Sequence, residues 1–476
     1  MARGRGDDGA RTGGIAVVLA AGEGKRLRSR LPKVLHEAAG RPLLGHVLEA
    51  LRPLGLDEVI VVTSSSGLIE AAFADEGCTF AVQDPPNGTG DALRVALAMA
   101  GAGDGHVMVV PGDTPLLTAE TLRSLWEDHV SSSAAATVLT ARAADSAGYG
   151  RVVRDADGGV EKIVEHRDAS TAELAIDEIN GGVYVFDRHG LEDLLAKLDS
   201  ENSQREYYLT DVIALLRASE RKVHALQVSE SEVAGVNSRS QLAQVTTLLH
   251  RRATEHWLEQ GVTIVDPATT YIDSQVTIEP DATILPFTFL QGSTTIGAGA
   301  EIGPQVRIVD SEVGPDAKVT FAVVRSSVLG PESSVGPFAS LRPGTRLGRG
   351  AELGTFVETK NAVVGDDSAA HHLAYLGDAE IGSGVNIGAG TITCNWDGQN
   401  KHRSVVDDDA YIGSDTMLVA PVHIGKRAAT GAGSVVRGDV PDDALAVGVP
   451  ARVIEGKGDK MKRLDEADRN RSDGGG

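Results

Sequence analysis

The chain has 476 residues, 41% of them hydrophobic and 24% charged, and a formal net charge of −22. This composition is typical of a globular protein with two or three domains, and the acidic balance argues against non-specific binding to nucleic acid. The sequence has no apolar run as long as a membrane span, no signal-peptide core in residues 1–14, and only Cys78 and Cys394 as cysteines. We therefore expect a cytoplasmic protein without a disulfide framework, without nucleic-acid partners and without membrane insertion.

Short aliphatic strands alternate with helices over residues 15–236. The strands are expected at Ile15–Ala20, Glu58–Thr63, Thr79–Val82 and His106–Pro111, and two of the helices at Asp91–Ala100 and Thr118–Val130. This alternation predicts a mainly parallel sheet covered by helices, an α/β domain. Ligands bind such sheets at the carboxyl ends of the strands, so we look for chemistry in the loops that follow them. The charged and Gly-rich ends of the chain, residues 1–14 and 456–476, are predicted to be disordered tails.

Residues 238–260 have the apolar spacing of one helix. Leu242, Val245, Leu248, Leu249 and Trp257 share a helical face, and the pattern stops at Gly261. We assign residues 237–261 to a helix that joins two domains. Packing of this helix against the first domain is an alternative that the sequence leaves open.

The second half of the chain repeats an aliphatic residue followed by glycine, mostly at steps of six or twelve residues. The pairs are Ile296-Gly297, Ile302-Gly303, Leu329-Gly330, Val335-Gly336, Leu347-Gly348, Leu353-Gly354, Ile381-Gly382, Ile387-Gly388, Ile412-Gly413 and Ile424-Gly425. Such a hexapeptide repeat predicts a parallel β-helix over residues 262–455, with about 18 residues per coil and roughly ten coils. Gly388 and Gly413 lie 25 residues apart, so the segment NWDGQNKHRS is expected to bulge out as a loop.

A glycine-containing loop follows the first strand. The strand IAVVLA continues into Ala21-Gly22-Glu23-Gly24-Lys25-Arg26-Leu27. Glycines at this place let backbone N–H groups approach phosphate, and the start of a helix favours negative charge. Arg26 and Lys33 are placed to flank one polyphosphate, and Pro32 stiffens the chain before Lys33.

The longer string LAAGEGKRL…LPKVLH resembles the signature of sugar-1-phosphate nucleotidyltransferases. Over residues 15–455 the chain is similar to the bifunctional family that joins an N-acetylglucosamine-1-phosphate uridyltransferase to a glucosamine-1-phosphate acetyltransferase. The resemblance implies a Rossmann-like nucleotidyltransferase domain, a linker helix and a left-handed parallel β-helix that assembles as a homotrimer. It also implies acetyl-CoA and UTP as co-substrates, Mg²⁺ at the N-terminal site, and UDP-N-acetylglucosamine, a precursor of bacterial envelope polymers, as the product.

For the first domain, the resemblance identifies residues that contact the nucleotide sugar. They are Leu19, Ala20, Ala21 and Gly22 in the loop, Gln83, Gly88 and Thr89 near the base, Gly150, Glu165 and Asn180 near the acetylated sugar, and Asn237. A side-chain amide with backbone groups can match a uracil edge. Taken alone, the Gly88-Thr89 segment could equally be an ordinary turn before a helix.

The resemblance implies that Asp113 and Asn237 hold Mg²⁺, which suits a hard cation with few protein ligands. An N-cap role is the structural alternative for Asp113. The implied reaction is an in-line displacement in which Arg26, Lys33 and Mg²⁺ neutralise charge, without a protein nucleophile. Lys25 departs from the family pattern, which usually has Thr there.

The string HHLAYLGDAEIGSGVNIGAGTITCNWDG resembles the acetyltransferase site of the same family. His372 corresponds to the general base that takes a proton from the attacking amine, a task suited to imidazole. The implied glucosamine-1-phosphate site comprises Arg342, Lys360, Tyr375 and Asn386, and the implied acetyl-CoA site comprises Ala389, Asn395, Trp396, Ser414 and Ala432. Cations at the first of these sites fit a phosphate dianion.

Two departures concern coenzyme A. Trp396 stands where Tyr is common, and Val449 stands where some relatives carry an Arg, a role for which Arg452 or Lys457 are candidates. The main alternative to a bifunctional enzyme is a single sugar-1-phosphate nucleotidyltransferase whose β-helix is structural or regulatory. A non-catalytic β-helix that only binds a partner is the remaining interpretation.

Overall fold

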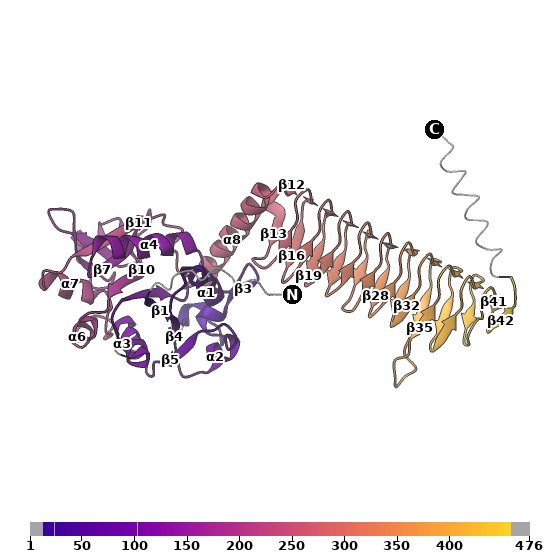
Figure 1. Ribbon diagram of the computed structural model, residues 1–476, viewed down its shortest axis with the longest axis horizontal. Helices are drawn as coiled ribbons and strands as arrows, with labels where there is room; N and C mark the ends of the chain where they lie inside the picture. The colour runs from indigo at the N-terminus through magenta and orange to yellow at the C-terminus, as the bar shows by residue number, and fades with distance from the viewer. Residues whose placement is uncertain (1–12, 23, 102, 458–476) are drawn as a thin grey trace, which may run out of the picture. The chain divides into compact units, whose positions relative to one another are not determined.

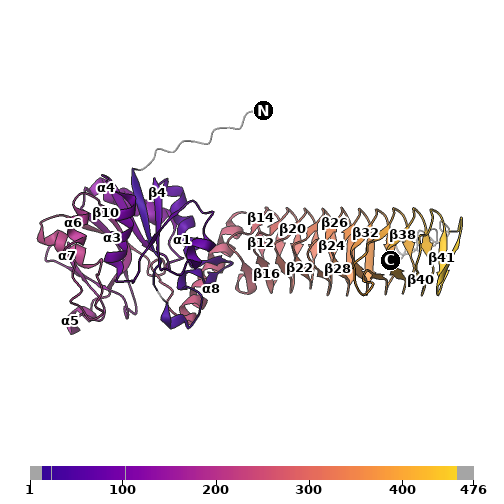
Figure 2. The same cartoon turned by 90° about the horizontal axis from the view of Figure 1, so that it is seen from below.

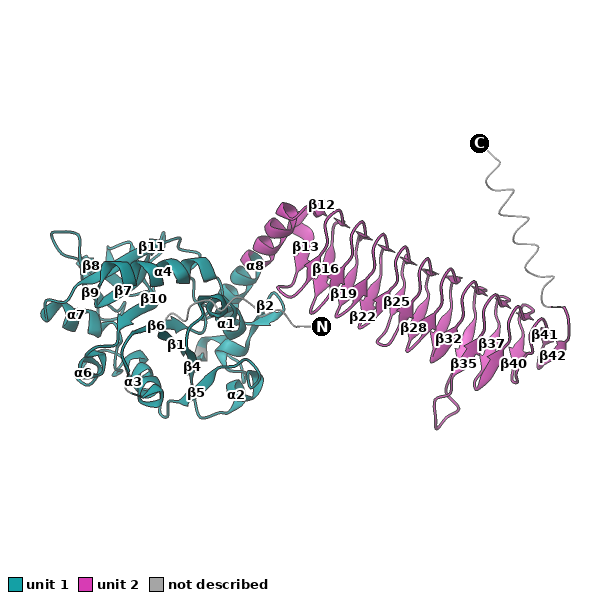
Figure 3. Ribbon diagram, viewed as in Figure 1, with its two compact units in different colours: residues 1–247 teal, residues 248–476 magenta. Residues whose placement is uncertain are grey.

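The computed structural model describes residues 13–22, 24–101 and 103–457, which form two compact units (Figure 1, Figure 3). The division falls between residues 247 and 248, inside helix α8 (Arg239–Glu259). The predicted disordered tails lie outside the described residues, apart from residues 13, 14, 456 and 457. None of the helices in the described ranges is both long and apolar enough to cross a membrane.

Unit 1 contains a mixed sheet of nine strands among its described residues, in the order β11-β7-β10-β6-β1-β4-β5, with β8 attached to β10 and β9 attached to β8. The strands are β1 (Gly14–Leu19), β4 (Glu58–Thr63), β5 (Thr79–Val82), β6 (His106–Pro111), β7 (Ala136–Arg142), β8 (Arg151–Arg154), β9 (Val160–Val164), β10 (Glu178–Asp187) and β11 (Val223–Val228). β6, β1, β4 and β5 are parallel, as predicted, whereas β10 is antiparallel to both β6 and β7. A small ribbon, β2 (Glu37–Ala38) and β3 (Arg41–Pro42), stands apart.

Helices cover both faces of this sheet. They are α1 (Leu43–Leu51), α2 (Leu68–Ala72), α3 (Thr89–Ala100), α4 (Ala119–Ser132), α6 (Leu191–Leu195) and α7 (Asp211–Ala218), with 3-10 turns η1 (Lys25–Leu27), η2 (Lys33–Leu35) and η3 (Arg52–Leu54). The short helix α5 (Thr171–Leu174) buries none of its side chains. Ile15 and Val17 of β1 face a core shared with α3, α6 and α7, while Ala16 and Val18 face a second core shared with α1 and α4. Alternate residues are thus buried on opposite faces, which explains why the strand is apolar throughout.

Unit 2 is a β-helix of three parallel sheets, seen as stacked coils in Figure 2. The first sheet contains β12 (Thr263–Ile264), β15 (Thr283–Ile284), β18 (Glu301–Ile302), β21 (Lys318–Val319), β24 (Ser334–Val335), β27 (Glu352–Thr355), β30 (Ala369–His372), β33 (Asn386–Ile387), β36 (Tyr411–Ile412), β39 (Ala429–Thr430) and β41 (Leu445–Gly448), ending in the antiparallel β42 (Ala451–Ile454). The second contains β13 (Thr270–Ile272), β16 (Thr288–Gln291), β19 (Arg307–Val309), β22 (Val323–Arg325), β25 (Ser340–Leu341), β28 (Glu358–Lys360), β31 (Tyr375–Gly377), β34 (Ile392–Cys394), β37 (Met417–Val419) and β40 (Val435–Val436). The third contains β14 (Thr277–Ile278), β17 (Thr295–Ile296), β20 (Glu312–Val313), β23 (Val328–Leu329), β26 (Arg346–Leu347), β29 (Val363–Val364), β32 (Ala379–Ile381), β35 (Ser404–Val406) and β38 (Val422–Ile424), and a 3-10 turn, η4 (Pro267–Thr269), follows β12.

The predicted α/β class is confirmed, and the stacked parallel sheets are consistent with the left-handed β-helix that the repeat and the resemblance predict. The aliphatic residue of each repeat points inward: Ile302, Val335, Leu353 and Ile412 are all at most 1% exposed. Strand pairing aligns them from coil to coil, so each aliphatic residue packs on its counterparts above and below. The step from Ile387 to Ile412 accommodates the expected loop, residues 395–403, between β34 and β35.

The glycine after each aliphatic residue allows neighbouring coils to approach closely. A Cβ added at Gly388 would lie 2.5 Å from the backbone nitrogen of Ser414 in the next coil, and one at Gly354 would lie 2.2 Å from the carbonyl oxygen of His371. Both distances are shorter than any non-bonded contact that a side chain can make. The second half of the repeat is therefore a requirement of coil spacing.

Acidic residues at the turns join successive coils. Carboxylate oxygens of Asp366, Asp408 and Asp442 accept hydrogen bonds of 2.8–2.9 Å from backbone N–H groups of the preceding coil. Carboxylates are strong acceptors for N–H groups that have no partner in a strand. Part of the negative charge of the chain is thus explained by the turns of the β-helix.

A buried histidine, His129, contacts the half-buried His106 at the amino end of β6. His129 of α4 is 1% exposed, and its ring nitrogens lie 3.0 Å from Thr137 Oγ1 and 3.2 Å from Nδ1 of His106. Burial and the neighbouring His106 lower the pKa of His129 to about 4, against the weaker attraction of Asp187 and Asp128. His129 is therefore neutral in the folded protein at neutral pH.

Because the unfolded chain binds a proton at His129 near pH 6.5 and the folded chain only near pH 4, the stabilisation is complete above pH 6.5 and is lost as the pH falls towards 4. We expect this group to remove on the order of 3 kcal/mol from the free energy of unfolding of unit 1 across that range. Hydrogen exchange of peptides from β6 and β7 measures this change. In His129→Gln the free energy of unfolding should lose this part of its pH dependence. If its slope against pH is unchanged in that variant, His129 is not the group responsible.

Candidate functional site

A cavity of about 980 Å³ opens in unit 1 at the carboxyl ends of the parallel strands. Among its lining residues are those that the sequence predicted for the nucleotide sugar and for charge neutralisation: Leu19, Ala20, Ala21, Gly22, Arg26, Lys33, Gln83, Gly88, Thr89, Asp113, Glu165, Asn180 and Asn237. Gly150 lies behind this lining, with its carbonyl oxygen 2.9 Å from the backbone nitrogen of Asn180. The fold thus brings together residues that are widely separated in the sequence.

One end of the cavity is built around Gln83, directly after β5. Its Nε2 atom donates to the Gly88 carbonyl at 3.0 Å and to Asp91 Oδ2 at 2.8 Å. Gly88 has a φ of 109°, and a Cβ there would lie 2.6 Å from the Tyr207 carbonyl oxygen. Tyr207 also bonds through its backbone to Asn87 and Gly90, so the turn after Gln83 is held on two sides.

One part of the cavity holds an ammonium group between two side-chain oxygens. Lys33 Nζ forms an ion pair with Asp113 and lies 3.2 Å from Asn237 Oδ1. Asp113 follows β6. The backbone nitrogen of Val236 donates to the backbone carbonyl oxygen of Asp113 at 2.9 Å, and this bond brings the Asn237 turn to the same edge of the sheet. Arg26 is exposed at the mouth of the cavity. The oxygens of Asp113 and Asn237 therefore converge on one cation-sized position.

The other end of the cavity carries Asn180 and Glu165. Asn180 Nδ2 donates to the Tyr184 hydroxyl at 2.7 Å and its Oδ1 accepts from Gly182 at 3.0 Å, which fixes the amide. Burial, together with the charges of Asp211, Asp168 and Glu206, raises the pKa of Glu165, while a 3.3 Å hydrogen bond from Thr210 opposes this rise. This end therefore offers hydrogen-bonding groups suited to sugar hydroxyls.

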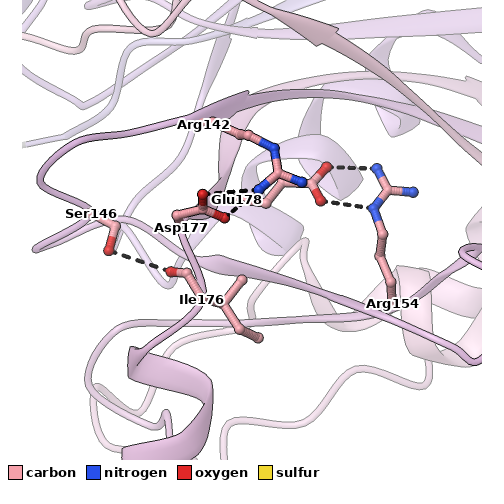
Figure 4. Close-up of polar contacts among 6 residues, drawn as sticks. All are labelled: Arg142, Ser146, Arg154, Ile176, Asp177 and Glu178. Carbon is pink, nitrogen blue, oxygen red and sulfur yellow. Dashed lines mark hydrogen bonds and ion pairs between the residues drawn. The ribbon is translucent and has the colours of Figure 1, made fainter.

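A set of ion pairs at the edge of the sheet supports this end of the cavity (Figure 4). Arg154 of β8 binds both carboxylate oxygens of buried Glu178 in β10, at 2.7 and 2.6 Å, and Arg142 of β7 binds both oxygens of Asp177 at 2.7 and 2.9 Å (Figure 4). The Arg154–Glu178 pair uses two guanidinium nitrogens, which fixes both its distance and its orientation, whereas one Arg142 nitrogen contacts both oxygens of Asp177. The Arg154–Glu178 pair holds β8 against β10, where Gly150 meets Asn180, and the Arg142–Asp177 pair joins the end of β7 to the residue before β10.

Sequence reasoning missed several residues of this cavity. Tyr184, His166, Arg167, Gln204, Glu206 and Thr210 also line it. Burial raises the pKa of Tyr184, so its hydroxyl stays protonated and can orient Asn180. The segment 204–210 contains no glycine and no recognisable motif. Its contact with the Gly88 turn is visible only in the structure.

In unit 2 the β-helix register brings residues of the second predicted site into one line. Strand pairing puts His372 one coil from Ala389, and Ala389, Ser414 and Ala432 occupy the same position of three successive coils. His372 is exposed at the end of β30. Its neighbour His371 instead bonds Glu352 at 2.8 Å. We call the line His372, Ala389, Ser414 and Ala432 the coil row.

The predicted phosphate-binding cations lie on the adjacent sheet. Arg342 and Lys360 follow each other on successive coils, since the backbone nitrogen of Arg342 donates to the carbonyl oxygen of Thr359 at 2.9 Å. The Arg342 guanidinium also forms an ion pair with Glu358 at 3.0 Å. The neighbouring ammonium of Lys401, and then Arg342, lower the pKa of Lys360. Lys401 was not among the predicted site residues. The break in the repeat at its loop, together with its charge, was the signal that could have identified it.

The remaining predicted residues lie on different elements. Tyr375 begins β31, with its hydroxyl against Gly377, and Asn386 begins β33. Asn395 donates to Asp378 at 2.6 Å, which anchors the loop 395–403, and Trp396 is 57% exposed on that loop. Val449 is exposed in the β41–β42 turn, and Arg452 pairs with Val447 within that hairpin.

Comparison with known proteins gives one domain match and many full-length relatives. Residues 16–260 match the model of a MobA-like NTP transferase domain. The chain is 50% identical to the bifunctional protein GlmU of Thermobifida fusca (92% of this chain, 93% of the relative) and 49% identical to that of Streptomyces avermitilis (90% and 91%). It is 46% identical to the protein of the same name from Exiguobacterium sibiricum (91% and 97%).

Proposed function

The chain belongs to the family of the bifunctional protein GlmU, and we propose on that basis that it makes UDP-N-acetylglucosamine in two steps. The β-helix transfers an acetyl group from acetyl-CoA to the amine of glucosamine-1-phosphate. Unit 1 then transfers uridylyl from UTP to N-acetylglucosamine-1-phosphate and releases pyrophosphate. The observation that carries the first-unit assignment is the single cavity lined by the loop after β1, Gln83, Asp113, Asn180 and Asn237.

A divalent cation fits the position between Asp113 and Asn237. A carboxylate and an amide oxygen already converge on the positive charge of Lys33. These two oxygens suit Mg²⁺, whose remaining ligands would be phosphate oxygens and water. When bound, Mg²⁺ would neutralise charge on the phosphates during uridylyl transfer.

We assign the following roles to the residues around the cavity. A phosphate oxygen of the sugar attacks the α-phosphorus of UTP in line with the leaving pyrophosphate, and no protein nucleophile takes part. Arg26 and Lys33, which both line the cavity, supply positive charge to the polyphosphate. Glu165 and the amide of Asn180, oriented by Tyr184, hold the acetylated sugar. Positioning and electrostatics together account for catalysis.

For the second site we assign the general base to His372. It lies in the coil row with Ala389, Ser414 and Ala432, the positions assigned to coenzyme A. The imidazole takes a proton from the 2-amine of glucosamine-1-phosphate while that nitrogen attacks the thioester carbonyl, and the coenzyme A thiolate leaves. Arg342, Lys360 and Lys401 supply the charge that holds the phosphate, with Tyr375 and Asn386 beside them.

A homotrimer is part of the proposal, and an exposed apolar line supports it. Phe321, Phe338, Phe356 and Leu373, which we call the corner ladder, occupy one corner of successive coils. The rings of Phe338 lie 5.4 Å and 5.6 Å from those of Phe321 and Phe356, and Phe338, Phe356 and Leu373 are 55–60% exposed. Such a continuous apolar line on an isolated chain favours burial against further copies. Because Leu373 follows His372, copies packed there would complete the acetyltransferase site.

We also assign the protein to the cytoplasm, where UTP and acetyl-CoA are available. Cys78 and Cys394 are both free thiols, which fits a reducing compartment. The product would serve the synthesis of bacterial envelope polymers.

The first test assays the full chain by mass spectrometry in two separate reactions, acetyl transfer from acetyl-CoA to glucosamine-1-phosphate and Mg²⁺-dependent uridylyl transfer from UTP to supplied N-acetylglucosamine-1-phosphate. His372→Ala should lower acetyl transfer by at least about a hundredfold and leave uridylyl transfer unchanged, because general-base catalysis contributes on that order. Asp113→Asn should have the reverse effect. His371→Ala is the matched control, and equal losses in both histidine variants would contradict the assignment of the base.

The second test concerns the cation position. Lys33→Met removes the ammonium that competes for Asp113 and Asn237, so the nucleotide-free protein should bind Mn²⁺ about tenfold more tightly, as measured by electron paramagnetic resonance. The exposed Arg26→Met variant should bind Mn²⁺ like the wild type. Loss of binding in Asp113→Asn locates the ion. Weaker or unchanged binding in Lys33→Met would exclude the competition.

The third test concerns the trimer. Phe338→Asn with Phe356→Asn removes the exposed rings, and Asn tolerates the positive φ of both positions, 60° and 57°. Light scattering should then show a shift from trimer towards monomer, with loss of acetyl transfer and retention of uridylyl transfer. Phe289→Asn, at an exposed aromatic residue of β16, is the control. A double variant that remains fully trimeric would remove the corner ladder from the interface.

A further inference from the structure

The buried amide of Gln83 has a fixed polarity. Gln83 is 3% exposed, and both of its amide contacts, the Gly88 carbonyl and the Asp91 carboxylate, are groups that only accept hydrogen bonds. The NH₂ group must therefore face them. With the NH₂ group committed, the carbonyl Oε1 is the polar atom that Gln83 can offer to a ligand in the cavity.

Asp91 is itself held in place. It lies in the first turn of α3, is 6% exposed, and its second carboxylate oxygen accepts from Arg94. The Arg94 guanidinium lies 5.6 Å from the centre of the Tyr207 ring, and the backbone of Tyr207 is bonded to Asn87 and Gly90. The carboxylate is thus oriented between a donor on each side, Arg94 and Gln83.

We infer that Asp91 is a specificity-determining residue that makes unit 1 select uracil over cytosine. The inference rests on the proposed function, in which Gln83 faces the base. Uracil carries an N–H at position 3, which donates to an outward carbonyl oxygen. Cytosine has a lone pair at that position, which would face the lone pairs of Oε1 and leave both groups without a partner. Asp91 acts through Gln83 and does not touch the base.

The substitution Asp91→Asn should reverse this polarity. The Arg94 guanidinium is a donor only, so it holds the Asn oxygen and leaves the Asn NH₂ facing Gln83. Two donors then oppose each other, and turning over the Gln83 amide relieves that contact. The turned amide presents N–H to the base and can donate to N3 of cytosine, although its oxygen now faces the Gly88 carbonyl.

The experiment measures kcat/KM for UTP and for CTP with N-acetylglucosamine-1-phosphate, in the full chain. We expect the UTP/CTP ratio to fall at least about tenfold in Asp91→Asn, since one unmade hydrogen bond is worth about this factor or more. Arg94→Met alone should keep the wild-type ratio. The double variant Asp91→Asn/Arg94→Met should recover part of it, because the Asn amide is then free to present its oxygen to Gln83.

Asp84→Asn, which removes the exposed carboxylate next to Gln83, controls for the loss of charge and should keep the wild-type ratio. A purely structural role for Asp91 would lower both kcat/KM values equally, and that unchanged ratio would overturn the inference. Calorimetric binding of UDP and CDP to the wild type tests nucleotide binding separately from the role of Asp91. If wild type binds and uses UTP but the ratio does not move, only the role of Asp91 fails; if it uses neither nucleotide, the proposed function fails.

Discussion

Parallel strand register is the constraint on which both candidate sites depend. In unit 1, β6, β1, β4 and β5 run in one direction, so the loops that follow them meet at one edge of the sheet. In unit 2, pairing between coils turns a separation of 16 to 25 residues in sequence into a neighbouring position in space, as from His372 to Ala389 and from Ala389 to Ser414. The site residues are therefore positioned by rigid backbone ladders, and only a few loops complete them.

The acidity of the chain and its expected anionic substrates are compatible because the charges are segregated. Many carboxylates are engaged by the fold: Asp366, Asp408 and Asp442 accept backbone hydrogen bonds between coils, and Glu178 is paired with Arg154. The cations Arg342, Lys360 and Lys401 instead gather on one part of the β-helix. Local positive sites can thus form on a strongly negative molecule, and net charge alone would have been misleading about substrate.

Sequence patterns predicted those features that depend on local spacing. The hexapeptide repeat predicted the β-helix and its loop, because an inward aliphatic residue and a glycine at the close approach are both required in every coil. The strand endings predicted the edge of the sheet at which Gln83 and Asp113 lie. The segment 204–210 and Tyr184 could not be predicted in this way, since their roles arise from contacts between segments that share no spacing or composition signal.

The same limit explains why a motif identifies a contact residue but not its chemical polarity. A glutamine presents either a donor or an acceptor, and only its neighbours determine which. For Gln83 those neighbours are the Gly88 carbonyl and Asp91, which lies in the first turn of α3. Asp91 is itself oriented by Arg94. For Asn180 the Tyr184 hydroxyl has the corresponding role. Selectivity in such a cavity therefore resides in the residues that orient an amide as much as in the amide itself.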